Sequence, residues 1–300
     1  MHAGFLPNEM AMSLLPLTVL ERLVWSWRNR HFTGKGWLLN RLCPRQGERT
    51  IQIATGARMV VDLGDHLQRL IYMDILHHDW YPALPALLRP GGAFLDVGAN
   101  VGYFSLLAAD LVKAQGTVIA VEPLPRTQAR LLANLALNGF SQVRIEATAL
   151  GERTGELELS VPPPEQRLDY LVSGLPVLQW KRERVPCTTL DEAWVRWGEP
   201  AFDLVKIDVE GSEPALIRGG RRALAQGAAR ALICEISGVH LAHHGLTPQA
   251  FVADLACLGF RHARIGRGRR VEPSPLPALS AARDYNLLFV HERGEYEGSG

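Results

Sequence analysis

Residues 96–105 read DVGANVGYFS and follow a short apolar stretch at 93–95. Apolar residues then recur with helical spacing, at Leu106, Leu107, Leu111 and Val112. This pattern predicts a strand, a tight glycine turn and a helix whose first backbone amides point into the turn. A second apolar stretch, 117–121, ends in Glu122, and a carboxylate there can accept hydrogen bonds from both hydroxyls of a ribose. Together these features predict a nucleoside site at the carboxyl edge of a parallel sheet.

The glycine spacing and the charge of the turn indicate which nucleoside binds. A dinucleotide fingerprint has glycines in the order G-x-G-x-x-G, whereas Gly98 and Gly102 are four residues apart. Asp96 at the strand end would repel a pyrophosphate but can pair with the ammonium group of S-adenosyl-L-methionine, which has no phosphate. The sequence therefore favours S-adenosylmethionine over NAD. The alternative is that the two glycines only allow close packing of the helix on the strand.

Composition narrows the class of protein. The chain has 300 residues, is 47% hydrophobic and carries a formal net charge of +1, so it can bury a core and gives no reason to expect a nucleic-acid partner. The cysteines are scattered, which favours reduced thiols in a cytoplasmic enzyme over a zinc site or disulfide framework. The abundance of Ala, Leu and Arg hints at a bacterial source.

The order of the expected elements predicts the fold class. Strands are expected at 93–97, 117–121, 143–149, 203–209 and 230–236, and helices at 101–113, 125–138 and 213–225 and from about residue 247. This alternation predicts an α/β fold with a doubly wound, mostly parallel seven-stranded sheet, similar to a Rossmann fold. Two final strands joined without a helix predict an antiparallel edge. Prolines and glycines in 152–186 predict strands and loops inserted beside the site.

Three regions are expected along the chain. Residues 1–85 form an N-terminal helical and β-hairpin extension, 86–293 the cofactor-binding domain, and 294–300 a flexible tail. Within the extension, 12–32 is apolar with interrupting charges and reads as an amphipathic helix. Such a helix either packs on the main domain or makes a peripheral contact with a membrane surface.

A second dense group of charges lies on the strand expected at 203–209. Lys206, Asp208 and Glu210 alternate with apolar residues, so all three are expected to project from one face near the strand's carboxyl end. Ligands of open α/β sheets bind at this edge. We therefore expect a cleft here, with Gly211 allowing the chain to turn away tightly and Ser212 capping the next helix.

The motifs together resemble those of FkbM-type S-adenosylmethionine-dependent methyltransferases. The matching segments occur in family order at 96–102, 121–123, 188–191, 206–211 and 286–289. The resemblance covers about residues 85 to 290 and implies methyl transfer to a hydroxyl oxygen, often on a sugar, glycolipid or natural product. The expected partner is thus a small-molecule or glycan acceptor. A nitrogen or protein acceptor, or a non-catalytic module that binds the cofactor, are the alternatives.

The resemblance also implies which residues bind the cofactor. Asp96 and Glu122 would hold its ammonium group and ribose, and the remaining contacts would come from Gly98, Asn100, Gly102, Pro123, Thr148 and Ala149. Thr148 or Ala149 lies where adenine usually rests. A carboxylate or amide is common at that place in methyltransferases, and this chain has neither.

Asp208 is the first candidate for the general base, with Lys206 beside it to orient the substrate or keep Asp208 ionised. The alternative role for Lys206 is a structural ion pair with Glu210. His240 is the second candidate, because a histidine accepts a proton near neutral pH.

Other groups near the expected edge are weaker candidates. His243 and His244 accompany His240, and their spacing also suggests a metal, although loop histidines are usually solvated. His77 and His78 precede the core and are a third possibility. Asp208, Glu210 and Glu235 could instead bind a divalent ion, but the adjacent lysine favours chemistry without a metal. A basic run at 261–270 is either a solvated turn or a contact for an anionic acceptor.

Overall fold

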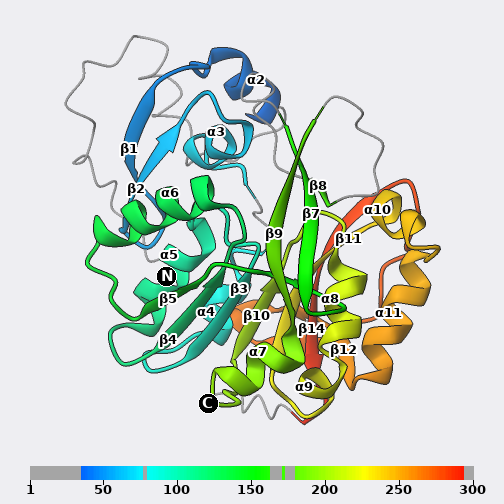
Figure 1. The fold of residues 1–300 in the computed structure, drawn as a ribbon. Helices are drawn as coiled ribbons and strands as arrows, with labels where there is room; N and C mark the ends of the chain where they lie inside the picture. The colour runs from blue at the N-terminus through cyan, green and yellow to red at the C-terminus, as the bar shows by residue number, and fades with distance from the viewer. Residues whose placement is uncertain (1–34, 77–79, 163–170, 173–179, 294–300) are drawn as a thin grey trace. The chain divides into compact units, whose positions relative to one another are not determined.

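The computed structural model describes residues 35–76, 80–162, 171–172 and 180–293, which belong to two compact units, 1–76 and 77–300 (Figure 1). The division therefore lies before the boundary at residue 85 expected from the sequence, because α4 (Ala83–Leu87) belongs to the second unit. The segment 12–32, the pair His77 and His78, and the tail from 294 lie outside the described residues.

The first unit is a small helical and hairpin structure. Its elements are α2 (Lys35–Leu42), β1 (Glu48–Gln52), β2 (Arg58–Asp62) and α3 (His66–Tyr72). β1 and β2 pair antiparallel, and Ile51, Met59 and Val61 are buried. Asp65 caps α3 by accepting a hydrogen bond from the amide of Gln68 at 2.9 Å. The expected hairpin is thus present, with a helix before it and another after it in the chain.

An eight-stranded sheet forms the centre of the second unit. Its strands are β3 (Ala93–Val97), β4 (Thr117–Val121), β5 (Val143–Glu146), β10 (Leu204–Ile207), β11 (Ala231–Ser237), β12 (Phe260–Ile265), β13 (Val271–Pro273) and β14 (Asp284–His291). They lie in the order β13-β12-β14-β11-β10-β3-β4-β5. The five strands from β11 to β5 are parallel, and β14 runs antiparallel between β11 and β12. The expected doubly wound sheet is confirmed, with an eighth strand because β13 pairs with β12.

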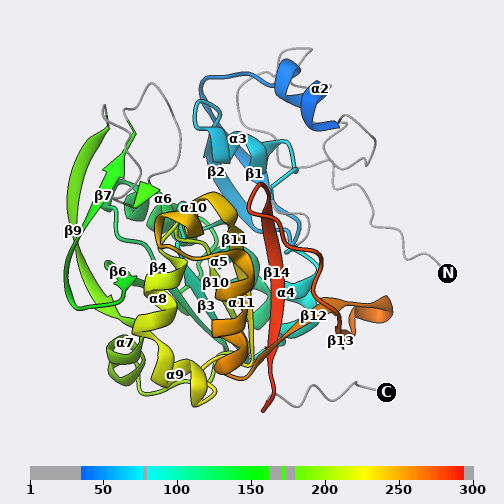
Figure 2. The same cartoon turned by 90° about the vertical axis from the view of Figure 1, so that its right-hand side faces the viewer.

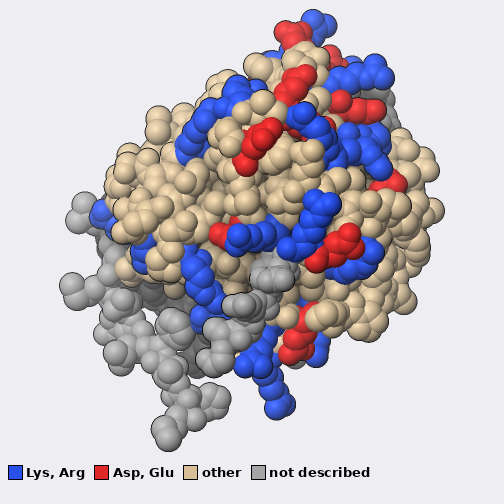
Figure 3. Space-filling model, turned by 90° about the horizontal axis from the view of Figure 1, so that it is seen from below, with Lys and Arg blue, Asp and Glu red and all other residues tan. Residues whose placement is uncertain are grey.

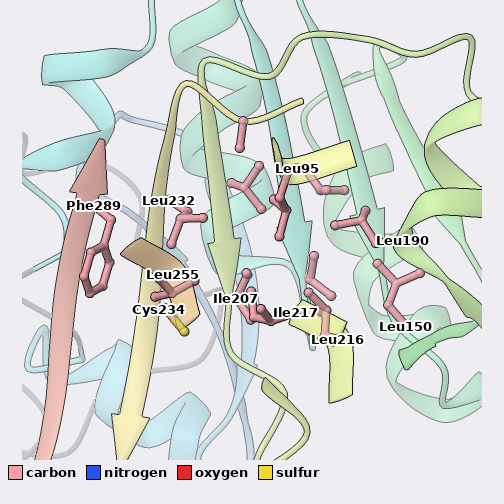
Figure 4. Packing of buried hydrophobic residues seen from close by; sticks show 14 of the residues in the cluster. Leu95, Leu150, Leu190, Ile207, Leu216, Ile217, Leu232, Cys234, Leu255 and Phe289 are labelled. Carbon is pink, nitrogen blue, oxygen red and sulfur yellow. The ribbon is translucent and has the colours of Figure 1, made fainter. Parts of the chain in front are cut away.

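Helices cover both faces of this sheet (Figures 1 and 2). They are α5 (Tyr103–Val112), α6 (Pro125–Ala136), α7 (Leu190–Arg196), α8 (Glu213–Gly219), α9 (Arg221–Ala225), α10 (Gly238–His243) and α11 (Pro248–Cys257), with a 3-10 turn, η1, at Arg267–Arg269. α5 packs against β3 and β4 on one face. On the other face, apolar side chains of strands and helices form one continuous core (Figure 4), including Leu95, Ile207, Leu232, Leu190, Leu216 and Leu255.

A second sheet stands beside the first. β6 (Ala149–Gly151), β7 (Gly155–Val161), β8 (Leu171–Val172) and β9 (Lys181–Thr189) lie in the order β6-β9-β7-β8, and β7 and β9 form a long antiparallel pair (Figure 2). This sheet confirms the strands expected within 152–186. It also shows that the single strand expected at 143–149 was wrong, because the chain leaves the central sheet after Glu146 and enters the second sheet at Ala149.

Surface charge is mixed on the face drawn in Figure 3, where acidic side chains lie between basic ones. This agrees with the net charge of +1. Among the residues that the structure describes, no helix combines the length and the apolar character needed to cross a membrane.

Candidate active site

The glycine turn after β3 brings two strand ends into contact. Gly98, Asn100 and Gly102 have left-handed backbone with φ of 78°, 50° and 93°, so the chain reverses within a few residues. A Cβ atom on Gly98 would lie 1.8 Å from the carbonyl oxygen of Asp208. Only glycine therefore lets the chain that follows β10 lie directly against this turn, at the place where strand order reverses.

The carboxylate of Glu122 fixes the turn from the neighbouring strand. One oxygen accepts the backbone amide of Asn100 at 3.0 Å, and the other accepts that of Leu124 at 2.9 Å. The side chain is fully buried, and burial raises its pKa to about 7. In this structure Glu122 thus shapes the loop around the cofactor site, while its contact with a ribose stays a prediction.

A buried lysine joins the two strand ends electrostatically. The Lys206 ammonium lies 3.3 Å from Asp96 and 3.4 Å from Asp208, and it donates a hydrogen bond to the carbonyl of Gly98 at 2.7 Å. Burial by itself lowers the pKa of Lys206, but the two carboxylates more than offset this and leave it raised. Lys206 is therefore a permanent cation that lies between the side chains of Asp96 and Asp208.

Asp96 and Asp208 differ sharply in exposure. Asp96 is fully buried and also accepts a hydrogen bond from the Ser105 hydroxyl at 2.6 Å. The ammonium beside Asp96 is that of Lys206, so a direct contact with the ammonium of a cofactor stays a prediction. Asp208 keeps 17% of its side chain exposed, so it is the member of this triad that a ligand can reach.

The charged alternation expected through residue 210 ends earlier than predicted. β10 stops at Ile207, and Glu210 has left-handed backbone with φ of 51°, so it belongs to the turn and not to the strand. Ser212 begins α8 without a side-chain cap. The carboxylate of Glu213 accepts the amides of Val209 and Gly211 instead, at 3.0 and 3.3 Å, and burial raises its pKa to about 7.

His240 lies against the same turn. It belongs to α10, so the expectation that these histidines occupy a loop was wrong. A Cβ atom on Gly211 would lie 3.3 Å from the His240 ring, and the His244 side chain lies 2.7 Å from the Gly211 carbonyl. Burial lowers the pKa of His240, with Asp208 and Asp284 among the charges that act on it. Asp208, Lys206 and His240 are thus brought to one edge, as expected.

An apolar pocket opens beside the glycine turn on the core face of the sheet. The cavity itself is narrow, about 20 Å³, and its walls come from β3, β4, β6, β7 and the turn after β10. Four of the residues expected to bind the cofactor line it, namely Gly98, Pro123, Thr148 and Ala149. Val209 lines it too, while Asp208 lies with Lys206 on the opposite side of the strand end.

A family model, the methyltransferase FkbM domain, matches residues 96–285. The chain belongs to this family. This FkbM-family chain is a methyltransferase, its cofactor is S-adenosylmethionine, and the resemblance seen in its motifs is confirmed.

Curated relatives are distant. The chain is 27% identical over 199 residues to 31-O-demethyl-FK506 methyltransferase FkbM of Streptomyces tacrolimicus, covering 57% of this chain and 75% of the relative. It is 26% identical over 182 residues to the 2-O-methyltransferase NoeI of Sinorhizobium fredii, covering 56% and 72%.

Two solved structures are similar to this FkbM-family chain. One is a methyltransferase FkbM from Methylobacillus flagellatus, with 16% identity and a TM-score of 0.41, covering 76% of this chain but only 55% of that one. The other is Aeropyrum pernix fibrillarin with bound S-adenosyl-L-methionine, with 11% identity and a TM-score of 0.38, covering 82% and 95%.

The apolar lining of this pocket matches the chemistry of the adenine part of the cofactor. Apolar side chains such as Leu157 and Val209 offer van der Waals contact to a purine, and Gly98 of the turn also lines the pocket. The Thr148 hydroxyl donates to the carbonyl of Pro186 at 3.0 Å, so adenine would meet this residue chiefly through its backbone and methyl group. Binding of adenine at this pocket, as the resemblance implies, stays a prediction.

Sequence reasoning missed one part of this edge in the FkbM-family chain. Glu235, on β11, was considered only as a metal ligand, yet burial together with the charges of Asp208, Glu213 and Asp284 raises its pKa to about 8. The sequence predicted that Glu235 lies near the end of a strand, but it did not show that Asp208, Glu213 and Asp284 lie close to it in space. Within the described ranges, no group of three or more His, Cys, Asp or Glu side chains is arranged to hold a metal ion.

Proposed function

We propose that this methyltransferase transfers a methyl group to a hydroxyl oxygen of a small acceptor, such as a sugar, glycolipid or natural product. The names of the two curated relatives both specify methylation at oxygen. The observation that carries the proposal is the position of Asp208, a partly exposed carboxylate held by Lys206 directly beside the glycine turn. The free cysteines at Cys43, Cys187, Cys234 and Cys257 support a reducing compartment, and we place the enzyme in the bacterial cytoplasm.

The arrangement suits the needs of hydroxyl methylation. S-adenosylmethionine supplies a methyl group on a positively charged sulfur, which needs a well-aligned nucleophile more than covalent help. Alignment can contribute roughly 7–11 kcal/mol to lowering the barrier. A hydroxyl is a weak nucleophile until its proton is removed, and a positioned base contributes about 10²–10⁴-fold in rate. Asp208 can accept a hydrogen bond from the hydroxyl, while Lys206 keeps that carboxylate in place.

Calorimetry followed by an acceptor screen tests this function. Purified protein should bind both S-adenosylmethionine and S-adenosylhomocysteine, with or without a chelator. Release of S-adenosylhomocysteine is then followed with hydroxyl acceptors and with matched amines and peptides. Turnover of hydroxyl acceptors supports the proposal. Turnover of amines or peptides alone would make the protein an N- or protein methyltransferase, and binding without any turnover would indicate a non-catalytic module.

A further inference from the structure

A second pocket lies on the face of the central sheet that carries Lys206. Its cavity volume is about 270 Å³, close to the lower end of the range of small-molecule sites, about 300–1,000 Å³. Ile233 and Leu288, which pair across β11 and β14, form an aliphatic part of its lining, while Leu232 and Cys234 belong to the core on the other face. Trp80, from the segment before α4, completes the wall.

Glu235 lies at the carboxyl-edge end of this pocket. It pairs directly with Asn286 of β14, and directly paired residues of antiparallel strands share a face. Asn286 lines the pocket. On the other side of β11, the parallel register pairs Ile207 with Cys234, so the next residues along, Asp208 and Glu235, stand beside each other. Glu235 therefore lies between the pocket and the carboxylate nearest the glycine turn.

The charges around Glu235 are mostly negative. Asp208 at the end of β10, Glu213 of α8 and Asp284 of β14 all act on it, and the cation that faces it, Lys206, is already shared by Asp96 and Asp208. His240 of α10 faces Asp208 and Asp284 and has a lowered pKa, so it is neutral at pH 7. Arg264 also lines the pocket, but it is ion-paired with Glu272 at 2.7 Å. The carboxylates around Glu235 therefore make this edge repel anions, because like charges in a partly buried site interact strongly.

Asp208 and Glu235 differ in how well each is suited to act as the general base. The Asp208 carboxylate is already engaged by the Lys206 ammonium at 3.4 Å. Burial and the neighbouring carboxylates raise the pKa of Glu235 to about 8, close to the pH at which a general base is most effective. Glu235 is also partly accessible.

We propose that the pocket between Trp80 and β11–β14–β12 receives an uncharged hydroxylated ring as the acceptor, and that Glu235 is the catalytic residue that takes its proton. This inference rests on the proposed function. The acceptor oxygen forms a bond to the methyl carbon as the carbon–sulfur bond breaks, and that electron pair stays on sulfur. The hydroxyl proton passes to the Glu235 carboxylate and from there to water. Asp208 orients the hydroxyl.

Kinetics against pH test the assignment of the base. The uncharged probes are methyl α-glucopyranoside and cyclohexane-1,2-diol. Methyl glucuronide, which differs from the glucoside by a carboxylate, is the anionic comparison. Glu235→Gln should lower kcat by about 10²–10⁴-fold and abolish the rise in kcat/KM near pH 8. Asp208→Asn should lower turnover but keep a rise, moved to lower pH because the Asp208 charge helps to raise the pKa of Glu235. Glu292→Gln, at an exposed residue paired with Arg261, is the matched control and should behave as the native chain. A rise near pH 8 that survives in Glu235→Gln would overturn the assignment.

Two further experiments test the location of the acceptor pocket and the preference for an uncharged acceptor. Ile265→Trp places a larger side chain in the lining and should raise KM for the acceptor while leaving S-adenosylhomocysteine affinity unchanged. The neutral glycoside should be preferred over the glucuronide by at least about tenfold, because the edge is acidic. An unchanged KM, or a preference for the glucuronide, would contradict the proposed pocket.

An acceptor-independent measurement covers the case in which no probe is turned over. A carboxyl group with a raised folded pKa costs stability as pH rises, so the difference in urea midpoint between Glu235→Gln and the native chain should widen from pH 5 to pH 8. A constant difference would overturn the role of Glu235. Methylation of amines but not hydroxyls would refute the proposed function, whereas hydroxyl turnover that is independent of Glu235 would refute only this inference.

Discussion

Glu122 shows how one buried carboxylate shapes the cofactor loop. Its two oxygens accept the amides of Asn100 and Leu124, and Glu122→Ala would leave both amides without that acceptor. Because an unsatisfied buried donor costs about 1–3 kcal/mol, the free energy of unfolding should fall by at least this amount. Affinity for S-adenosylmethionine should weaken by about 1.5–3 kcal/mol, as for the loss of hydrogen bonds to a charged group. Urea denaturation and calorimetry measure the two effects, and unchanged affinity would refute the role of Glu122 in cofactor binding.

Asp208 and Lys206 should respond differently to substitution, although they form one ion pair. Asp208→Asn leaves Lys206 paired with the buried Asp96, so turnover should fall while cofactor affinity and stability change little. Lys206→Met leaves Asp96 buried without its cation, which should cost about 3–5 kcal/mol of stability. Activity, calorimetry and denaturation on both variants separate the two roles. Full turnover of a true acceptor by Asp208→Asn would direct attention to His240 as the group that contacts the hydroxyl.

Among the elements, the glycine turn between β3 and α5 should be the least tolerant of change. Gly98→Ala combines a backbone φ of 78° with a Cβ that would lie 1.8 Å from the Asp208 carbonyl oxygen. The chain after β10 would have to move, so we expect loss of both cofactor binding and several kcal/mol of stability. Gly139→Ala is the control, because its φ is 67° but nothing lies within 4 Å. Its cost should be the backbone strain alone, about 1 kcal/mol. Similar stabilities for the two variants would contradict the close approach.

Local patterns predicted the elements that local interactions decide. The turn at Gly98 and the helix α5 follow from glycine spacing and apolar periodicity, and both are present. The end of β10 was missed, because the alternation of charged and apolar residues continues to Glu210 while the strand ends at Ile207. The chain turns where the Asp208 carbonyl lies against Gly98, a residue more than a hundred positions away in the sequence. The break after Glu146 was missed for a similar reason, since β6 pairs with the distant strand β9.

The same limit applies to the candidate site. Strand-end charges placed Asp208 and Lys206 beside the glycine turn, because the carboxyl ends of parallel strands share one edge. The pairing of Lys206 with Asp96 depends on register between β3 and β10, and the importance of Glu235 depends on its pairing with Asn286. Register is set by the packing of whole strands, which the spacing of residues within one segment does not reveal.

For the whole molecule, buried acids set the dependence of stability on pH. The pKa values of Glu122 and Glu213 are raised to about 7, and that of Glu235 to about 8, from an ordinary value of 4.5. The folded state therefore keeps protons that the unfolded chain has released, so these groups make stability fall as pH rises from about 4.5 to 8. His66, His240 and His291 have lowered pKa values and act in the opposite direction, but only below their ordinary value of 6.5.

Above pH 6.5 the acids act without that opposition, so the free energy of unfolding should decrease between pH 6.5 and 8. The slope is at most about 1.4 kcal/mol per pH unit for each proton that the folded state retains. Urea midpoints measured at several pH values across this window test the expectation. In Glu213→Gln the buried carboxyl group is replaced by an amide that does not titrate. The folded state then retains one proton fewer relative to the unfolded chain, so the curve of stability against pH should be flatter. A midpoint that rises with pH would mean that these carboxylates are ionised in the folded protein, with Lys206 compensating more of their charge than its contacts with Asp96 and Asp208 suggest.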